Sequence, residues 1–224
     1  MTSTTAASRV VKAREVKISA GSLLLNGELK IPENATGIVL FAHGSGSSRH
    51  SPRNQYVARV IREVGVATLL FDLLTRQEET IDNYTREFRF DINLLARRLV
   101  AATNWLAGAE ETRHLRPGYF GASTGGGAAL VAAAEMGRKV GAVVSRGGRP
   151  DLAEPALGHV KAPTLLIVGG LDGPVIRMNE DAYVQLRCMK ELKIIPGATH
   201  LFEEPGKLEE VANLAAKWFL KHLQ

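Results

Sequence analysis

The strongest chemical signal in the sequence is a serine enclosed by small residues. Ser123 lies in the segment Gly121-Ala122-Ser123-Thr124-Gly125, which matches the pattern G-x-S-x-G. An apolar segment precedes it and a Gly/Ala-rich segment follows, which predicts a serine on a sharp turn between a strand and a helix. Small neighbours are needed there because larger side chains would collide with the flanking elements. The alternative is a tight turn in which the serine is incidental.

A serine hydroxyl becomes a good nucleophile only when a base removes its proton. His200 is the candidate base, because it follows the apolar segment ELKIIPG and comes directly before the last helical segment. Asp172 follows the apolar segment TLLIVGG and is the candidate acid that orients the histidine and fixes its tautomer. An exposed loop histidine and a turn aspartate are the alternatives, and Asp151 is a second candidate for the acid.

An acyl-transfer site also needs hydrogen-bond donors for the oxyanion that develops on the substrate. We expect one donor to be the backbone N–H of Thr124 and the other that of Ser45, in the glycine-rich segment HGSGSS. Gly44 and Gly46 would let this loop approach the substrate. His43 is interpreted as a residue that pins the loop. A phosphate-binding role for the loop is the alternative, although the lysine of a P-loop is missing.

Two arginines follow another predicted strand, in the segment VVSRGGRPD. Arg146 and Arg149 could bind a substrate carboxylate, because guanidinium groups hold carboxylates through paired hydrogen bonds. Alternatively, they tie loops together by bonding backbone carbonyls, Asp151 or Glu154.

Apolar segments alternate with amphipathic ones along the whole chain, which predicts an α/β fold with a mostly parallel sheet and helices on both faces. The first two strands should form an antiparallel hairpin that turns through residues 20–22. Functional residues should lie beyond the carboxyl ends of the strands. The eight expected strands cover residues 14–21, 22–32, 37–44, 66–72, 118–123, 141–148, 164–170 and 191–197. The expected helices cover residues 51–65, 82–106, 124–136, 175–186 and 207–223, with a short helix or turn over 151–158.

The motifs FAHGSG, GYFGASTGG, LLIVGGLD and PGATHLF together resemble the α/β-hydrolase family. Within it the chain is most similar to the dienelactone-hydrolase-related proteins, and the resemblance covers nearly the whole chain. It implies an α/β-hydrolase fold without a cap domain, with Ser123, Asp172 and His200 as a catalytic triad. It also implies that Ser45 and Thr124 form the oxyanion hole. Dienelactone hydrolases proper carry a cysteine in the elbow where this chain has serine, so the lactone substrate does not carry over directly.

These observations predict a serine hydrolase that cleaves carboxylic esters, including lactones or thioesters, through an acyl-enzyme on Ser123. An acyltransferase that uses the same three residues is one alternative. A non-catalytic ligand-binding protein on a hydrolase fold is another. We expect a small-molecule ester as the partner, and the sequence does not indicate an oligomeric state.

The length, charge and hydropathy of the chain predict the number of domains and exclude several kinds of partner. A chain of 224 residues predicts one domain over 13–224, preceded by a flexible tail over 1–12. The formal net charge of +5 comes from scattered residues, so a nucleic-acid partner is not expected. The sequence contains neither the ~20-residue apolar segment of a membrane helix nor the apolar core of a secretory signal.

The only cysteine, Cys188, cannot form an internal disulfide, which is compatible with a reducing compartment. Together with the missing signal and membrane segments, this predicts a cytoplasmic location. No Cys/His spacing suggests a metal, and no dinucleotide-binding glycine motif follows a strand. We therefore expect no metal and no cofactor.

Overall fold

The computed structural model describes residues 11–224, which form an eight-stranded sheet in the order β1-β2-β4-β3-β5-β6-β7-β8. The strands β3 to β8 run parallel to one another, whereas β1 and β2 pair antiparallel and β2 also meets β4 in the antiparallel sense. The strands are β1 (Val11–Ala20), β2 (Leu23–Pro32), β3 (Gly37–Ala42), β4 (Ala67–Phe71), β5 (Arg116–Ala122), β6 (Ala142–Arg146), β7 (Thr164–Gly169) and β8 (Lys190–Ile195). The predicted mostly parallel α/β sheet with an antiparallel start is confirmed.

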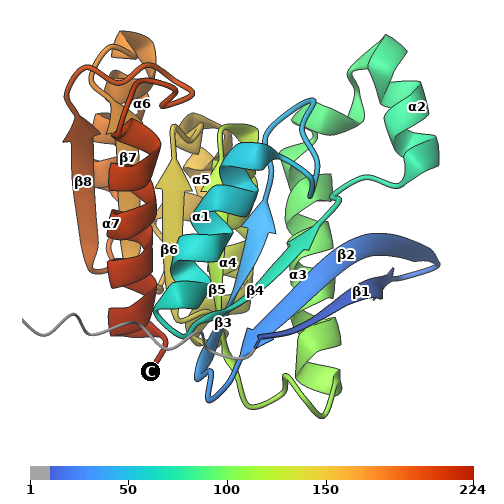
Figure 1. The fold of residues 1–224 in the computed structure, drawn as a ribbon. Helices are drawn as coiled ribbons and strands as arrows, with labels where there is room; N and C mark the ends of the chain where they lie inside the picture. Colours follow the sequence, from blue (N-terminus) through green and yellow to red (C-terminus); the bar gives the residue numbers. More distant parts are fainter. Residues whose placement is uncertain (1–10) are drawn as a thin grey trace, which may run out of the picture.

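Helices cover both faces of the sheet (Figure 1). The seven α-helices of the described residues are α1 (Pro52–Glu63), α2 (Arg76–Thr85), α3 (Ile92–Gly108), α4 (Thr124–Met136), α5 (Glu154–Leu157), α6 (Gly173–Gln185) and α7 (Lys207–His222). Short 3-10 helices lie at η1 (Phe88–Phe90), η2 (Gly137–Lys139) and η3 (Pro150–Ala153). Among residues 11–224, none of these helices combines the length and the apolarity needed to cross a membrane.

Strand alternation sends neighbouring core residues to opposite faces. Tyr119 packs in the core that α3 and α4 cover, whereas Phe120 packs in the core that α1 and α7 cover. Both side chains are fully buried. Each face therefore has its own apolar core, and this double burial explains why the central strands are apolar throughout.

The first hairpin closes as expected but begins earlier than expected. Ala20 pairs with Leu23 across a two-residue turn, and Gly21 adopts a φ of +68° that favours glycine. Val11 and Lys12, which were expected to belong to the tail, are instead the first residues of β1 and pair with the end of β2. The remainder of the expected tail lies outside the described residues.

The single helix expected over residues 82–106 is wrong, because the chain forms α2, η1 and α3 there. Arg86 has a φ of +58°, a left-handed conformation that ends α2. The side chain of Asp91 then accepts a hydrogen bond from the backbone N–H of Leu94 at 2.8 Å and caps the start of α3. The bend between these residues separates the two helices.

The α2–η1 segment, residues 76–90, stands beyond the carboxyl edge of the sheet (upper right in Figure 1). An ion pair of 2.5 Å between Glu78 and the buried Arg98 ties α2 to α3. The buried carboxylate of Asp82 accepts hydrogen bonds from the backbone N–H groups of Phe88 (2.8 Å) and Arg89 (3.0 Å). The segment is therefore held in place near the edge where functional residues are expected.

Candidate active site

Ser123 lies at the junction of β5 and α4, with φ 52° and ψ −121°. This conformation is sparsely populated for residues other than glycine and typically costs about 1–3 kcal/mol. The surrounding glycines make the turn possible. A Cβ atom on Gly121 would lie 2.4 Å from the carbonyl oxygen of Gly125, and one on Gly125 would lie 2.1 Å from the carbonyl oxygen of Ala42. Close packing of strand and helix thus fixes a strained, serine-bearing turn.

His200 and Asp172 come together at the same edge of the sheet. His200 lies in the loop between β8 and α7, and Asp172 is the residue directly before α6, shortly after β7. The Nδ1 atom of His200 lies 2.6 Å from Oδ2 of Asp172. A carboxylate can only accept, so Nδ1 carries the proton and donates it to Asp172. The other ring nitrogen, Nε2, is then free to accept a proton.

The end of β6 connects the serine turn to the histidine. The N–H of Ser123 donates to the carbonyl oxygen of Arg146 at 3.2 Å. A Cβ atom on the next residue, Gly147, would lie 3.4 Å from the imidazole ring of His200. Within residues 11–224 no hydrogen bond joins Ser123 Oγ to His200, and such bonds are often long before substrate binds. The structure therefore brings the three expected residues to one region of the sheet edge.

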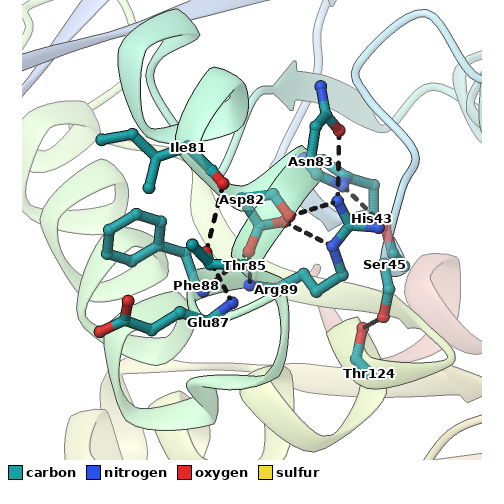
Figure 2. Close-up of polar contacts among 11 residues, drawn as sticks. His43, Ser45, Ile81, Asp82, Asn83, Thr85, Glu87, Phe88, Arg89 and Thr124 are labelled. Carbon is teal, nitrogen blue, oxygen red and sulfur yellow. Dashed lines mark hydrogen bonds and ion pairs between the residues drawn. The ribbon is translucent and has the colours of Figure 1, made fainter.

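The glycine-rich loop after β3 packs directly against the serine turn. A Cβ atom on Gly44 would lie 3.2 Å from Cβ of Ser123, and Gly46 has a φ of +68°. The hydroxyl oxygens of Ser45 and Thr124 lie 3.1 Å apart and share a hydrogen bond (Figure 2). The two residues expected to supply oxyanion donors are therefore neighbours beside Ser123.

His43 is buried at the base of this loop. Its Nε2 accepts a hydrogen bond from the backbone N–H of Leu73 at 3.0 Å, and its Nδ1 lies 3.1 Å from the carbonyl oxygen of Gly44. Burial lowers the pKa of the His43 imidazole, because it disfavours the charged form. This arrangement fits a neutral residue that pins the loop.

The two arginines of the segment after β6 differ in their surroundings. Arg149 donates two hydrogen bonds to the carboxylate of Asp151, at 2.8 and 2.7 Å. Arg146 is buried, with its guanidinium carbon 5.9 Å from the centre of the Phe202 ring. Burial, together with the nearby charge of Arg53, lowers the pKa of Arg146 to about 10. Arg149 therefore matches the alternative in which it ties loops together. Asp151, the second candidate for the acid, accepts the hydrogen bonds of Arg149.

The α2–η1 segment supplies a second wall beside the glycine-rich loop, which was not predicted from the sequence. Asp82, Asn83 and Arg89 line a cavity of about 80 Å³ together with Ser45 and Thr124. These residues lie far from the glycine-rich loop in the sequence, and their spacing matches no motif. No group of three His, Cys, Asp or Glu side chains that could hold a metal occurs in the described part of the chain.

Comparisons with known proteins identify the family and the fold. The model of the family described as "Dienelactone hydrolase family" matches residues 25–224. A crystal structure of a dienelactone hydrolase from Anabaena variabilis is 65% identical, with a TM-score of 0.94, and the match covers 96% of this chain and 99% of that one. Est1E from Butyrivibrio proteoclasticus is 17% identical with a TM-score of 0.78, over 92% of this chain and 98% of its own, which shows the shared fold.

Two curated proteins from strains of Mycobacterium tuberculosis are 57% identical over 218 residues, and both carry the name "Putative phosphoribosyl transferase". The match covers 97% of this chain but 48% of each of those proteins. The chain thus spans about half the length of these curated relatives.

Proposed function

The chain belongs to the dienelactone hydrolase family, and we propose that it is a serine hydrolase that cleaves carboxylic esters through an acyl-enzyme on Ser123. Lactones and thioesters are candidate substrates for the same chemistry. The observation that carries the proposal is the 2.6 Å hydrogen bond between His200 and Asp172, at the sheet edge where the strained turn presents Ser123. It supplies an oriented base for a nucleophile that needs one.

In the proposed first step, Ser123 Oγ attacks the carbonyl carbon of the ester while its proton moves to Nε2 of His200. The Asp172 carboxylate keeps accepting the hydrogen bond from Nδ1 and stabilises the imidazolium that forms. The carbonyl electron pair moves onto oxygen, and the backbone N–H groups of Ser45 and Thr124 donate to this oxyanion. The glycine-rich loop and the serine turn already pack against each other, which supports an oxyanion site that is formed before substrate binds.

In the second step the tetrahedral intermediate collapses, the bond to the alcohol oxygen breaks, and His200 returns its proton to the leaving alcohol. Water then attacks the acyl-enzyme and gives a proton to His200, which passes it to Ser123 Oγ as the carboxylic acid leaves. The cycle restores Ser123. The phosphoribosyl transferase in the name of the curated relatives concerns proteins about twice as long as this chain, and it forms no part of this proposal.

Labelling with a fluorophosphonate, followed by mass spectrometry of the modified peptide, tests the proposal. These reagents trap an activated serine and largely ignore an ordinary one. We expect the label on Ser123, its loss in Ser123→Ala, and much slower labelling in His200→Ala. An unlabelled but folded protein would refute the hydrolase proposal and favour a ligand-binding protein on a hydrolase fold.

A further inference from the structure

The cavity between the glycine-rich loop and the α2–η1 segment bears on which esters this site accepts. Ser45 and Thr124, the residues proposed to hold the oxyanion, form one of its walls, and Arg89 of η1 forms part of another. The cavity therefore borders the proposed oxyanion site, and a group attached close to the reacting carbonyl is the part of an ester that would reach it. The charges and hydrogen-bond donors of its lining should decide which group that is, and this inference rests on the function proposed above.

Arg89 is held rigidly but keeps one nitrogen free. Its Nε donates to the carboxylate of Asp82, and its Nη2 donates to the backbone oxygen of Asp82 at 3.0 Å and to Oδ1 of Asn83 at 3.2 Å (Figure 2). The Nη1 atom has no hydrogen-bond partner among residues 11–224. It lies beside the glycine-rich loop, since a Cβ atom on Gly46 would be 3.7 Å from it. Arg89 therefore offers fixed N–H donors on the side of the loop.

The charge of Arg89 is already balanced, and the cavity lining is acidic overall. The charged lining residues within the described part of the chain are Arg89, Asp72, Glu79 and Asp82. Asp82 pairs with Arg89, and Asp72 pairs with Arg49. Glu79 has no ion pair among the described residues. Burial lowers the pKa of His43, and the carboxylates of Asp72 and Glu79 partly oppose this; all three residues line the cavity.

We infer that this cavity selects esters that carry a neutral, oxygen-bearing group next to the reacting carbonyl, such as an ether or a hydroxyl, and disfavours a carboxylate there. A neutral oxygen can accept from Nη1 of Arg89 and carries no charge for the Glu79 carboxylate, unpaired within residues 11–224, to repel. A carboxylate would have to approach Glu79 and Asp82, and like charges at short range repel. An apolar group of the same size would leave the donors of Arg89 without a partner.

Three ethyl esters test the inference: the methoxyacetate, the butanoate, which replaces the ether oxygen by a methylene, and the hemisuccinate, which adds a carboxylate. The value of kcat/KM for each ester is divided by its own rate of alkaline hydrolysis, so that intrinsic reactivity cancels. We expect the wild-type protein to favour methoxyacetate over butanoate by about tenfold, which is the scale of a hydrogen bond to a charged donor. Hemisuccinate should be the poorest substrate.

Two variants test which residues cause the expected selectivity. Arg89→Met should lower kcat/KM for methoxyacetate about tenfold and leave butanoate within about twofold. Glu79→Gln changes an exposed residue and should raise kcat/KM for hemisuccinate about threefold to fivefold relative to kcat/KM for butanoate. Arg59→Met is the matched control, because it removes an exposed arginine that pairs with Glu63 on α1, away from the cavity. It should leave all three ratios unchanged.

A wild-type protein that favours hemisuccinate, or an Arg89→Met variant that loses activity equally on all three esters, would overturn the inference. If Arg89→Met does not fold, an unchanged hemisuccinate rate in Glu79→Gln would overturn it. Fluorophosphonate labelling of the same preparation distinguishes a failure of the cavity inference from a failure of the hydrolase proposal. A labelled Ser123 without the expected selectivity refutes the cavity inference alone, whereas an unlabelled protein refutes the hydrolase proposal on which it rests.

Discussion

Removing the hydroxyl of Thr124 tests how the glycine-rich loop is held against the serine turn. Ser45 Oγ and Thr124 Oγ1 share a hydrogen bond of 3.1 Å between segments that are 79 residues apart in the chain. Thr124→Val removes this bond but keeps the side-chain volume and the backbone N–H expected to bind the oxyanion. A hydrogen bond between neutral groups contributes about 0.5–1.5 kcal/mol net. If the transition state loses that amount, kcat falls about twofold to twelvefold.

The size of the decrease in kcat shows whether the Thr124 hydroxyl positions the loop or binds the oxyanion directly, because loss of an oxyanion donor typically costs about 10²–10³ in kcat. Steady-state kinetics on 4-nitrophenyl acetate should show the small decrease in kcat with KM nearly unchanged. Thr124→Ser, which keeps a hydroxyl, should resemble the wild type. Ser45→Ala combined with Thr124→Val should cost little more than either change alone, since both remove the same bond. Fully additive losses, or a fall beyond about 100-fold, would refute the positioning role.

Three further changes test other parts of the site. Asp172→Asn should lower kcat by about 10⁴, as in other serine triads, because the amide favours the wrong tautomer of His200; a loss below tenfold in steady-state assays would contradict the proposed role. Arg146→Met should change KM equally for neutral and anionic esters, because this guanidinium is buried; a selective rise for anionic esters would support the substrate-binding alternative. Burial raises the pKa of Asp82, but hydrogen bonds from Arg89 and Phe88 outweigh it and lower the pKa below 3.8. Its stabilising contribution is therefore present above about pH 4 and lost as the pH falls through the lowered value. Urea unfolding should show Asp82→Asn clearly less stable than the wild type at pH 7, with a difference that narrows as the pH falls below about 4.

The sheet could be predicted because its signals are local. Central strands such as β3 and β7 are apolar throughout and end in glycine or small residues, and the helices between them force parallel pairing. The α2–η1 segment could not be predicted by periodicity, since apolar residues recur across the bend as they would in one helix. Its start was nevertheless visible, because Thr75 and Glu78 form a reciprocal capping box. The left-handed conformation of Arg86 has no such signature.

At the end of a strand, two adjacent side chains point to opposite faces of the sheet, and this direction decides which neighbours each can contact. The sequence indicates the direction only through the alternation of faces along the strand. At the end of β6, Ser145 points toward α4, where its hydroxyl lies 2.6 Å from the position of a Cβ atom on Gly126. Arg146 points to the opposite face and lies over Phe202. The position of Arg146 at this edge of the sheet can be predicted from the sequence, whereas the burial of its guanidinium cannot.

Reaction type and substrate preference are encoded in different ways in this fold. Ser123, Asp172 and His200 each follow a strand, so parallel pairing alone brings them to one edge, and each lies in a short recognisable segment. The cavity wall depends on Asp82 holding Arg89 across a bend and on where α3 anchors α2. Such contacts change when a few residues of the α2–η1 segment change, while the carboxyl edge of the sheet stays the same. We therefore expect relatives with the same three residues to differ in the esters they cleave according to the segment between β4 and α3.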